Sequence, residues 1–168
     1  TIALLYNATG VGKTITAATD AKAVGGRTLF LVNALKLASQ AKETFAKVWP
    51  EATLGEYTGS QKDMTQTVIF ATVQSISKDL EKFSPTDFDY LIVDECHHAA
   101  ANTYQKIFTY FHPKFILGLT ATPERSDGED MLELFQNVAH KMDLKTAVER
   151  GVLVPIRCIR VKTNIDLT

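Results

Sequence analysis

The chain has 168 residues, of which 45% are hydrophobic and 22% are charged, and its formal net charge is -1. This composition suits one globular domain with a single core, and it excludes a strongly basic protein that binds nucleic acid or anionic membranes by overall charge. No apolar run reaches the roughly 20 residues of a membrane-spanning helix. The start lacks a signal-peptide pattern, and two cysteines make no disulfide framework. We therefore expect a cytoplasmic protein with no membrane partner.

Apolar runs alternate with helical patterns along the chain. The pattern predicts strands at Ile2–Tyr6, Arg27–Asn33, Leu54–Tyr57, Val68–Ala71, Phe88–Glu95 and Lys114–Thr120. Between and after them it predicts helices at Lys13–Val24, Ala34–Val48, Gln74–Phe83 and Thr103–Phe111, and short helices at Leu132–Val138 and Leu144–Arg150. Polar loops are predicted at Gly59–Gln66 and Pro123–Asp130.

The strands are apolar on both faces, which is typical of a parallel sheet covered by helices on each side. We therefore predict the α/β class, with three α/β/α layers and a mostly parallel central sheet. In such sheets, ligands bind at the carboxyl ends of the strands. Three chemically suggestive stretches follow predicted strands: Asn7–Thr14, Asp94–His98 and Thr120–Pro123.

The segment "ATGVGKT" lies where the first strand meets the first helix. Gly10 and Gly12 permit backbone angles with positive φ, so that consecutive N–H groups can surround an anion at the start of the helix. Lys13 can reach the β- and γ-phosphates of a nucleotide, and the Thr14 hydroxyl can bind Mg²⁺. The strict phosphate-loop pattern has Gly where this chain has Asn7. The alternative is a Gly-rich turn that holds no ligand.

The segment "LIVDECHH" places two carboxylates at the end of the strongest predicted strand. Asp94 can hold Mg²⁺ through a water molecule, and Glu95 can orient or deprotonate an attacking water. The alternative is a strand that merely ends in acidic residues. A zinc site at Cys96, His97 and His98 is disfavoured, because three adjacent ligands do not have the spacing of a tetrahedral site.

The segments "ATGVGKT", "DECHH" and "GLTATP", in this order, resemble motifs I, II and III of superfamily 2 helicases and translocases. The second has the D-E-x-H form of the DEAH-like branch, and the chain is most similar to the helicase (res) subunit of type III restriction enzymes. "LFLVNALKLASQA" resembles motif Ia, and "ERGVLVPIRCIRV" resembles the exit from the first motor domain. The resemblance implies a RecA-like P-loop NTPase domain over residues 1–152, and an exit strand or linker over 153–168 that leads to a second motor domain.

The resemblance also implies ATP and Mg²⁺ as cofactors and a role for each matching position. Nucleotide binding would fall on Thr9, Gly10, Val11, Gly12, Lys13 and Thr14. Mg²⁺ would be held by Thr14 and Asp94, and the catalytic residues would be Glu95, as the base, with Lys13 and Asp94. Coupling of hydrolysis to motion would fall on His97, Thr120 and Thr122. Nucleic-acid contacts would fall on Asn33, Thr72 and Gln74.

Two departures from the family pattern concern binding. Relatives often have Arg where this chain has Ala34, and the segment that reads adenine would precede Thr1. Both ends of the sequence suggest a domain cut from a longer chain, with the second RecA-like domain absent. That domain supplies arginines to the γ-phosphate, and such an arginine is worth roughly 10³–10⁵ in rate. We therefore expect these residues alone to hydrolyse ATP weakly or not at all.

The favoured function is an ATP-dependent nucleic-acid helicase or translocase that moves on DNA or RNA, with DNA favoured as the partner. The first alternative is the duplex-DNA translocase of a restriction system, with a nuclease or methyltransferase subunit as a further partner. The second is a switch-like P-loop ATPase without a nucleic-acid track. A degenerate module without activity is disfavoured, because Lys13, Asp94 and Glu95 are all present.

Overall fold

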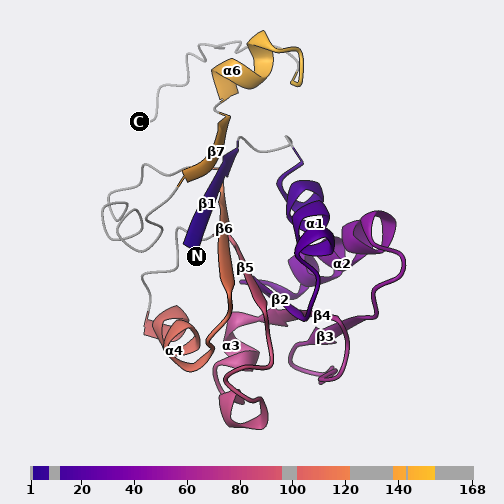
Figure 1. Cartoon of the computed structure of the whole chain (residues 1–168), viewed down its shortest axis with the longest axis vertical. Coiled ribbons are helices and arrows are strands. Elements are labelled where there is room, and N and C mark those ends of the chain that lie inside the picture. Colours follow the sequence, from indigo (N-terminus) through magenta and orange to yellow (C-terminus); the bar gives the residue numbers. More distant parts are fainter. Residues whose placement is uncertain (1, 8–11, 96–101, 122–137, 143, 154–168) are drawn as a thin grey trace, which may run out of the picture.

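A computed structural model describes residues 2–7, 12–95, 102–121, 138–142 and 144–153. This part of the chain forms a seven-stranded sheet in the order β3-β4-β2-β5-β6-β1-β7 (Figure 1), and every adjacent pair is parallel. The strands are β1 (Ile2–Asn7), β2 (Thr28–Val32), β3 (Leu54–Tyr57), β4 (Val68–Thr72), β5 (Tyr90–Asp94), β6 (Phe115–Thr120) and β7 (Val138–Met142). The helices are α1 (Lys13–Val24), α2 (Leu35–Val48), α3 (Val73–Ile76), the 3₁₀ helix η1 (Leu80–Lys82), α4 (Asn102–Tyr110) and α6 (Leu144–Glu149).

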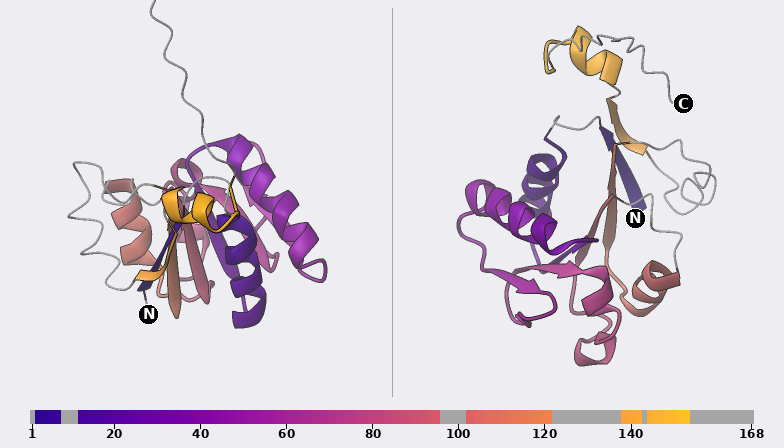
Figure 2. Two further views of the ribbon diagram at one scale, coloured as in Figure 1. Left: turned by 90° about the horizontal axis from the view of Figure 1, so that it is seen from above. Right: turned by 180° about the vertical axis from the view of Figure 1, so that it is seen from behind.

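Helices cover both faces of the sheet, which confirms the predicted three-layer α/β/α architecture. Figure 2 shows the sheet between α4 on one side and α1 with α2 on the other. Successive side chains of a strand point to opposite faces. Leu29 and Leu31 of β2 accordingly share one core cluster with residues of α3 and α4, while Phe30 and Val32 share the other with residues of α1 and α2. Both faces of β2 are therefore buried, as in other parallel sheets.

Aromatic packing fixes α2 on the sheet. The Phe45 ring of α2 meets the Phe70 ring of β4 edge to face, with centroids 5.1 Å apart, and it meets the Phe30 ring of β2 at 5.5 Å. The other buried residues of α2 are Ala38 and Ala41, so Phe45 is the one large side chain among the three. Docking of α2 therefore depends mainly on Phe45, with Leu37 and Val48 packed, partly buried, against the same core cluster.

The prediction of a continuous helix over Gln74–Phe83 is wrong. Helix α3 ends at Ile76, and a separate 3₁₀ turn follows at Leu80–Lys82. The break lies at Asp79, whose carboxylate accepts hydrogen bonds from the Tyr57 hydroxyl (2.8 Å) and from the ammonium groups of Lys62 (2.9 Å) and Lys82 (2.8 Å). These bonds hold the pKa of Asp79 below its usual range. Contacts with β3 and the loop after it thus replace helix continuation.

The remaining elements follow the prediction, with shifts of at most two residues at their ends. The exception is β7, which pairs in parallel with β1 and begins at Val138, where the sequence pattern predicts the end of a helix. Residues 132–137 of that predicted helix and the predicted loop at Pro123–Asp130 lie outside the described residues. In the described part of the chain, no helix has both the length and the hydropathy needed to cross a membrane.

Candidate functional site

The carboxyl ends of three adjacent strands bring the phosphate-loop and acidic segments to one edge of the sheet. β6 lies between β5 and β1, with Asp94 opposite Leu119 and Thr120 opposite Tyr6 in the parallel register. Helix α1 follows β1 and begins at Lys13. The structure therefore places the beginning of α1 and the ends of β5 and β6 at the same edge. Residues Thr9, Gly10, Val11, His97 and Thr122 of the predicted site lie outside the described residues.

The first turn of α1 has the form of an anion-binding helix terminus. Gly12 precedes the helix with φ 82° and ψ 32°, in the left-handed region. A Cβ at this position would meet nothing closer than the Ile15 side chain at 3.8 Å, so the backbone angle rather than space favours glycine. No side chain caps this terminus, and its first turn carries no acidic residue. The amides and partial positive charge there are suited to a phosphate.

The end of β5 carries two carboxylates in an unusual local backbone. Glu95 has φ 51° and is the one non-glycine residue with positive φ in the described ranges. Its N–H donates to Asp94 Oδ1 at 3.1 Å, so the aspartate side chain supports this conformation. Non-glycine residues in the left-handed region are uncommon and cluster at functional sites.

Burial and nearby charges shift the pKa of Asp94. Burial raises the pKa of the Asp94 carboxyl, and the negative charge of Glu95 raises it further. The Glu95 N–H and the positive charge of Lys13 act in the opposite direction. Lys13 is therefore within electrostatic reach of the acidic pair. A buried carboxylate beside a like charge is characteristic of a functional site rather than a stabilising one.

Replacing Asp94 with Asn is expected to stabilise the nucleotide-free protein. Because the pKa of Asp94 is raised in the folded protein, its ionised carboxylate destabilises the fold at pH values above that folded-state pKa. A neutral amide removes this free-energy cost. The gain should be present at about pH 8 and should shrink as the pH falls toward the ordinary aspartate value of about 4, because the wild-type carboxyl then becomes neutral. Thermal unfolding at both pH values measures the effect.

Asp89 provides a control of opposite sign. The Lys114 ammonium, 2.8 Å from its carboxylate, and the Arg27 N–H lower the pKa of Asp89. Its contribution to stability is present above the unfolded pKa and is lost as the pH falls through the folded pKa. Asp89→Asn should therefore destabilise the protein at about pH 8 and have less effect at about pH 4. A destabilised Asp94→Asn protein at the higher pH would contradict the conclusion that burial and the Glu95 charge oppose ionised Asp94.

The candidate nucleic-acid residues lie on the adjoining half of the same edge. Asn33 follows β2 and Thr72 ends β4, and these strands are neighbours. Asn33 is half-buried, and its Oδ1 accepts a 2.6 Å hydrogen bond from the Tyr104 hydroxyl. Thr72 is buried and its hydroxyl donates to Ser75 Oγ at 2.8 Å, whereas Gln74 is exposed. Of the three, Asn33 and Gln74 present polar groups at the surface.

Sequence reasoning missed Tyr104. The aromatic residues of α4 have the spacing of a helix face that packs in a core, and Tyr104 does belong to the core cluster. Its hydroxyl, however, bonds a residue 71 positions earlier in the chain. A buried tyrosine hydroxyl usually has a hydrogen-bond partner, so the sequence could indicate that a polar group lies near Tyr104. It could not indicate which residue supplies that group.

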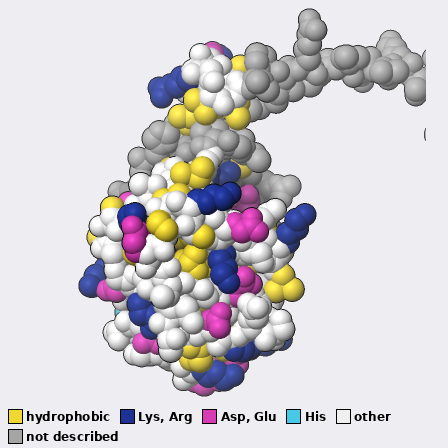
Figure 3. Space-filling view, turned by 90° about the vertical axis from the view of Figure 1, so that its right-hand side faces the viewer, with side chains coloured by type: hydrophobic (Ala, Val, Ile, Leu, Met, Phe, Trp, Pro, Cys, Tyr) yellow, Lys and Arg dark blue, Asp and Glu magenta, His cyan; other side chains and the backbone are white. Residues whose placement is uncertain are grey.

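The face covered by α1 and α2 carries charges of both signs. Figure 3 shows lysine or arginine and acidic side chains interspersed over it. Lys42 of α2 pairs with Glu56 at 3.3 Å, and Lys22 of α1 pairs with Glu51 at 3.3 Å. The Lys22–Glu51 pair is exposed and contributes little to stability, whereas the Lys42–Glu56 pair is partly buried. This mixed surface does not have the single-sign character of a nucleic-acid groove, which leaves the sheet edge as the candidate contact region.

Comparisons with known proteins agree with this arrangement. Residues 1–125 match the family described as the type III restriction enzyme, res subunit. The chain is 29% identical over 98% of its length to the type I restriction enzyme EcoAI endonuclease subunit of Escherichia coli, and it spans 22% of that protein. It is 33% identical over 74% of its length to the DNA 3'-5' translocase XPB2 of Sulfurisphaera tokodaii, and it spans 28% of that protein.

A solved structure shows the same fold. The helicase domain of Pyrococcus furiosus Hef covers 94% of this chain with a TM-score of 0.75 and 25% identity, and the chain covers 38% of it. The domain is therefore of the RecA-like helicase type. Since the family match includes the phosphate loop, the acidic strand end and the strand that carries Thr120, the chain belongs to the family of the type III restriction enzyme res subunit.

Proposed function

We propose that this chain is the ATP-binding motor domain of an ATP-dependent nucleic-acid helicase or translocase. The observation that carries the proposal is the meeting of the α1 terminus, the acidic end of β5 and the end of β6 at one sheet edge, in a chain of this family. A switch-like ATPase without a nucleic-acid track would also need the α1 terminus and the acidic end of β5. The residues at the ends of β2 and β4 extend the same edge for a second ligand.

The residues at the first half of this edge fit Mg–ATP. Hydroxyl and carboxylate oxygens, as on Thr14 and Asp94, are the ligands that Mg²⁺ prefers, and it is usually held by one or two carboxylates together with substrate phosphates. Burial and the neighbouring Glu95 charge both raise the pKa of Asp94, and a bound cation would favour its ionised form.

We assign the roles at this site as follows. The amides at the start of α1, with the Lys13 ammonium, hold the β- and γ-phosphates. When bound, Mg²⁺ neutralises charge that develops on the transferred phosphoryl group. Asp94 and Thr14 hold the ion, and the Glu95 carboxylate orients the attacking water and accepts its proton. The left-handed backbone of Glu95 directs its side chain differently from that of a regular strand residue, which supports a separate role for each carboxylate.

We further propose that residues 1–152 form the first of two RecA-like domains, with 153–168 leading to the second. The D-E-x-H segment supports assignment to the DEAH-like branch. Within that assignment, His97, Thr120 and Thr122 couple hydrolysis to movement between the domains. Thr120 lies fully buried at the end of β6, beside β1 and β5. A structural change at the phosphate site could reach it through these two neighbouring strands.

The nucleic-acid track is proposed to be DNA, with its backbone contacted by Asn33 and Gln74. Buried Thr72, whose hydroxyl donates to Ser75 Oγ, would support the turn that carries Gln74. The restriction subunit of Escherichia coli, which aligns over nearly the whole chain, specifically favours a second candidate function. In that case the motor moves along duplex DNA without separating the strands and works with a nuclease or methyltransferase subunit. Contacts to phosphates would make binding weaken with added salt in either case.

The test is the ATPase rate of the full protein with no nucleic acid, single-stranded DNA, duplex DNA and RNA. Lys13→Ala serves as the inactive control, and Lys47→Ala, in the exposed last turn of α2, controls for loss of a positive charge. Stimulation by DNA that Lys13→Ala abolishes supports a motor, and the preferred form of DNA separates the two candidates. A rate that no polymer changes would contradict the motor and favour a switch-like ATPase.

A further inference from the structure

The Tyr104 hydroxyl connects two parts of the functional edge that are distant in sequence. Tyr104 lies on α4, which in the described part of the chain is the next helix after the acidic end of β5. Asn33 lies in the turn between β2 and α2. The 2.6 Å bond between the Tyr104 hydroxyl and Asn33 Oδ1 therefore reaches from the helix that follows the acidic pair to the candidate nucleic-acid residue.

The ring of Tyr104 is firmly held, so its hydroxyl has a defined position. Tyr104 is only 3% exposed and shares a core cluster with Leu31 of β2 and Val93 of β5. Those two residues lie two positions before Asn33 and one position before Asp94, respectively. A phenylalanine would fill the same apolar space, so the packing explains the ring and not the hydroxyl.

The bond determines which group Asn33 presents. An asparagine amide has one acceptor oxygen and an NH₂ group with two donors. Because Tyr104 donates to the oxygen, the amide orientation is fixed and the NH₂ group is turned away from Tyr104. A donor in a fixed orientation at the carboxyl edge of the sheet is suited to a phosphate oxygen of a nucleic-acid backbone.

We propose that Tyr104 is a positioning residue for nucleic-acid binding, which holds the Asn33 amide so that its NH₂ group faces the backbone of the bound strand. This inference rests on the proposed function and adds a residue to it. Tyr104 itself does not touch the nucleic acid. Its contribution is to reduce the number of Asn33 orientations that must be lost on binding.

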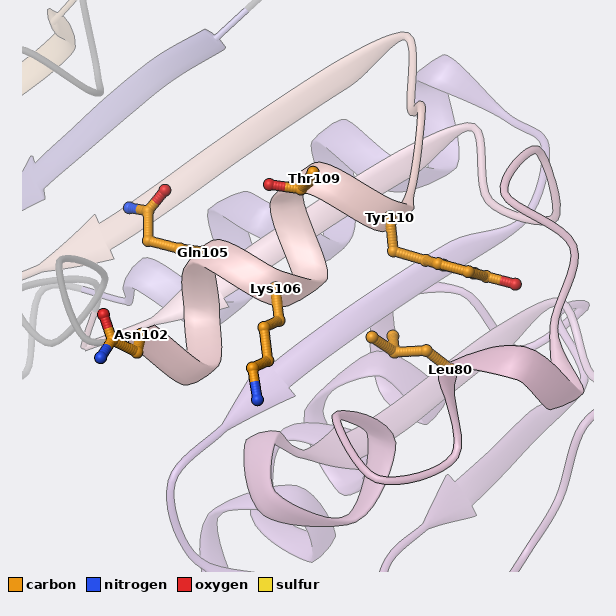
Figure 4. Close-up of a pocket in the computed structure, with 6 residues that line it drawn as sticks. All are labelled: Leu80, Asn102, Gln105, Lys106, Thr109 and Tyr110. Atoms are coloured by element: carbon orange, nitrogen blue, oxygen red, sulfur yellow. The ribbon is translucent and has the colours of Figure 1, made fainter.

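The same helix supplies a matched control. The Tyr110 hydroxyl donates to the Phe83 carbonyl oxygen, also at 2.6 Å. Figure 4 shows Tyr110 at the far end of α4, beside Leu80, where the two residues line a surface pocket of about 660 Å³. Tyr104→Phe and Tyr110→Phe each remove one hydroxyl and one short hydrogen bond from α4. A purely structural role predicts the same result for both.

The experiment measures binding of a fluorescein-labelled single-stranded DNA oligonucleotide by the full protein, by fluorescence anisotropy. Tyr104→Phe is expected to weaken binding roughly three- to tenfold, the cost of ordering one additional side chain on binding, and Tyr110→Phe is expected to bind like the wild type. In ATPase assays, the DNA concentration for half-maximal stimulation should rise in Tyr104→Phe, with no matching rise in the KM for ATP.

A double-mutant cycle shows whether Tyr104 acts through Asn33. If it does, Tyr104→Phe should have no further effect on DNA binding in a protein that already carries Asn33→Ala. Equal DNA binding by Tyr104→Phe and Tyr110→Phe, or additive effects of Tyr104→Phe and Asn33→Ala, would overturn the inference while wild-type stimulation by DNA leaves the proposed function standing. A wild-type protein that binds no DNA or RNA would overturn both.

Discussion

Replacing Glu95 with Gln is expected to lower the rate of ATP hydrolysis by roughly 10²–10⁴-fold, the contribution of a positioned general base, while ATP binding is retained. Glutamine keeps the size of the side chain but cannot accept the proton of the attacking water. The residues assigned to the phosphates lie before α1 and in its first turn, and the substitution does not alter them. Because Glu95 is assigned neither to the phosphates nor to Mg²⁺, nucleotide affinity should not fall.

The measurement pairs the turnover number with the dissociation constant of a fluorescent ATP analogue. Glu81→Gln is the matched control, because Glu81 is an exposed glutamate of the η1 turn and its loss should leave both quantities unchanged. Hydrolysis by Glu95→Gln at the wild-type rate would contradict the role of Glu95 as base. Loss of binding together with hydrolysis would show that Glu95 supports nucleotide binding instead.

Replacing Phe45 with Ala is expected to reduce the free energy of unfolding by about 3–5 kcal/mol, the usual cost of deleting a fully buried phenylalanine side chain. Phe45 is fully buried and contacts the rings of both Phe30 and Phe70. The other buried residues of α2 are alanines, and these cannot replace the lost contacts. Because domains of this size are stable by only about 5–15 kcal/mol, the variant should be near the limit of folding.

Urea unfolding, followed by circular dichroism, measures this change. Phe115→Ala is the control, because the Phe115 side chain is 40% exposed and its removal leaves little cavity. Phe45→Leu should recover a large part of the loss, since it refills most of the volume. Equal destabilisation by Phe45→Ala and Phe115→Ala would contradict the conclusion that α2 docks mainly through Phe45.

The elements that the sequence predicts well have strong local signals. "FDYLIVDE" is apolar on both faces, and its core, Tyr90–Asp94, forms the central strand β5. Helix α1 begins and ends where the sequence pattern places it, because Gly12 precedes it and Gly25 follows it with positive φ. Local propensity and tertiary packing agree at these positions, so the pattern is sufficient.

The elements that the sequence predicts badly depend on distant partners. The break after Ile76 is tied to Asp79, which bonds Tyr57 and Lys62 on and after a separate strand. The segment Val138–Met142 has few strand-forming residues and gains its conformation by pairing with β1, at the other end of the chain. Neither contact can be predicted from the residues of the segment itself.

The candidate site divides in the same way. Lys13, Asp94 and Glu95 stand out because their residue types and spacing are chemically specific, and the fold brings the strands that carry them to one edge. The contribution of Tyr104 was not predictable, because a tyrosine and a phenylalanine of α4 give the same apolar periodicity. Only the folded structure shows that its hydroxyl reaches Asn33.

The most direct test of the central claim is whether ATP and nucleic acid bind to coupled halves of one sheet edge. The measurement is the affinity of the full Glu95→Gln protein for single-stranded and duplex DNA, with and without saturating Mg–ATP. Our account predicts that ATP changes the DNA affinity by roughly 5–150-fold, as in typical coupled sites, and that DNA changes the ATP affinity by the same factor. DNA affinities that are identical with and without ATP would contradict it.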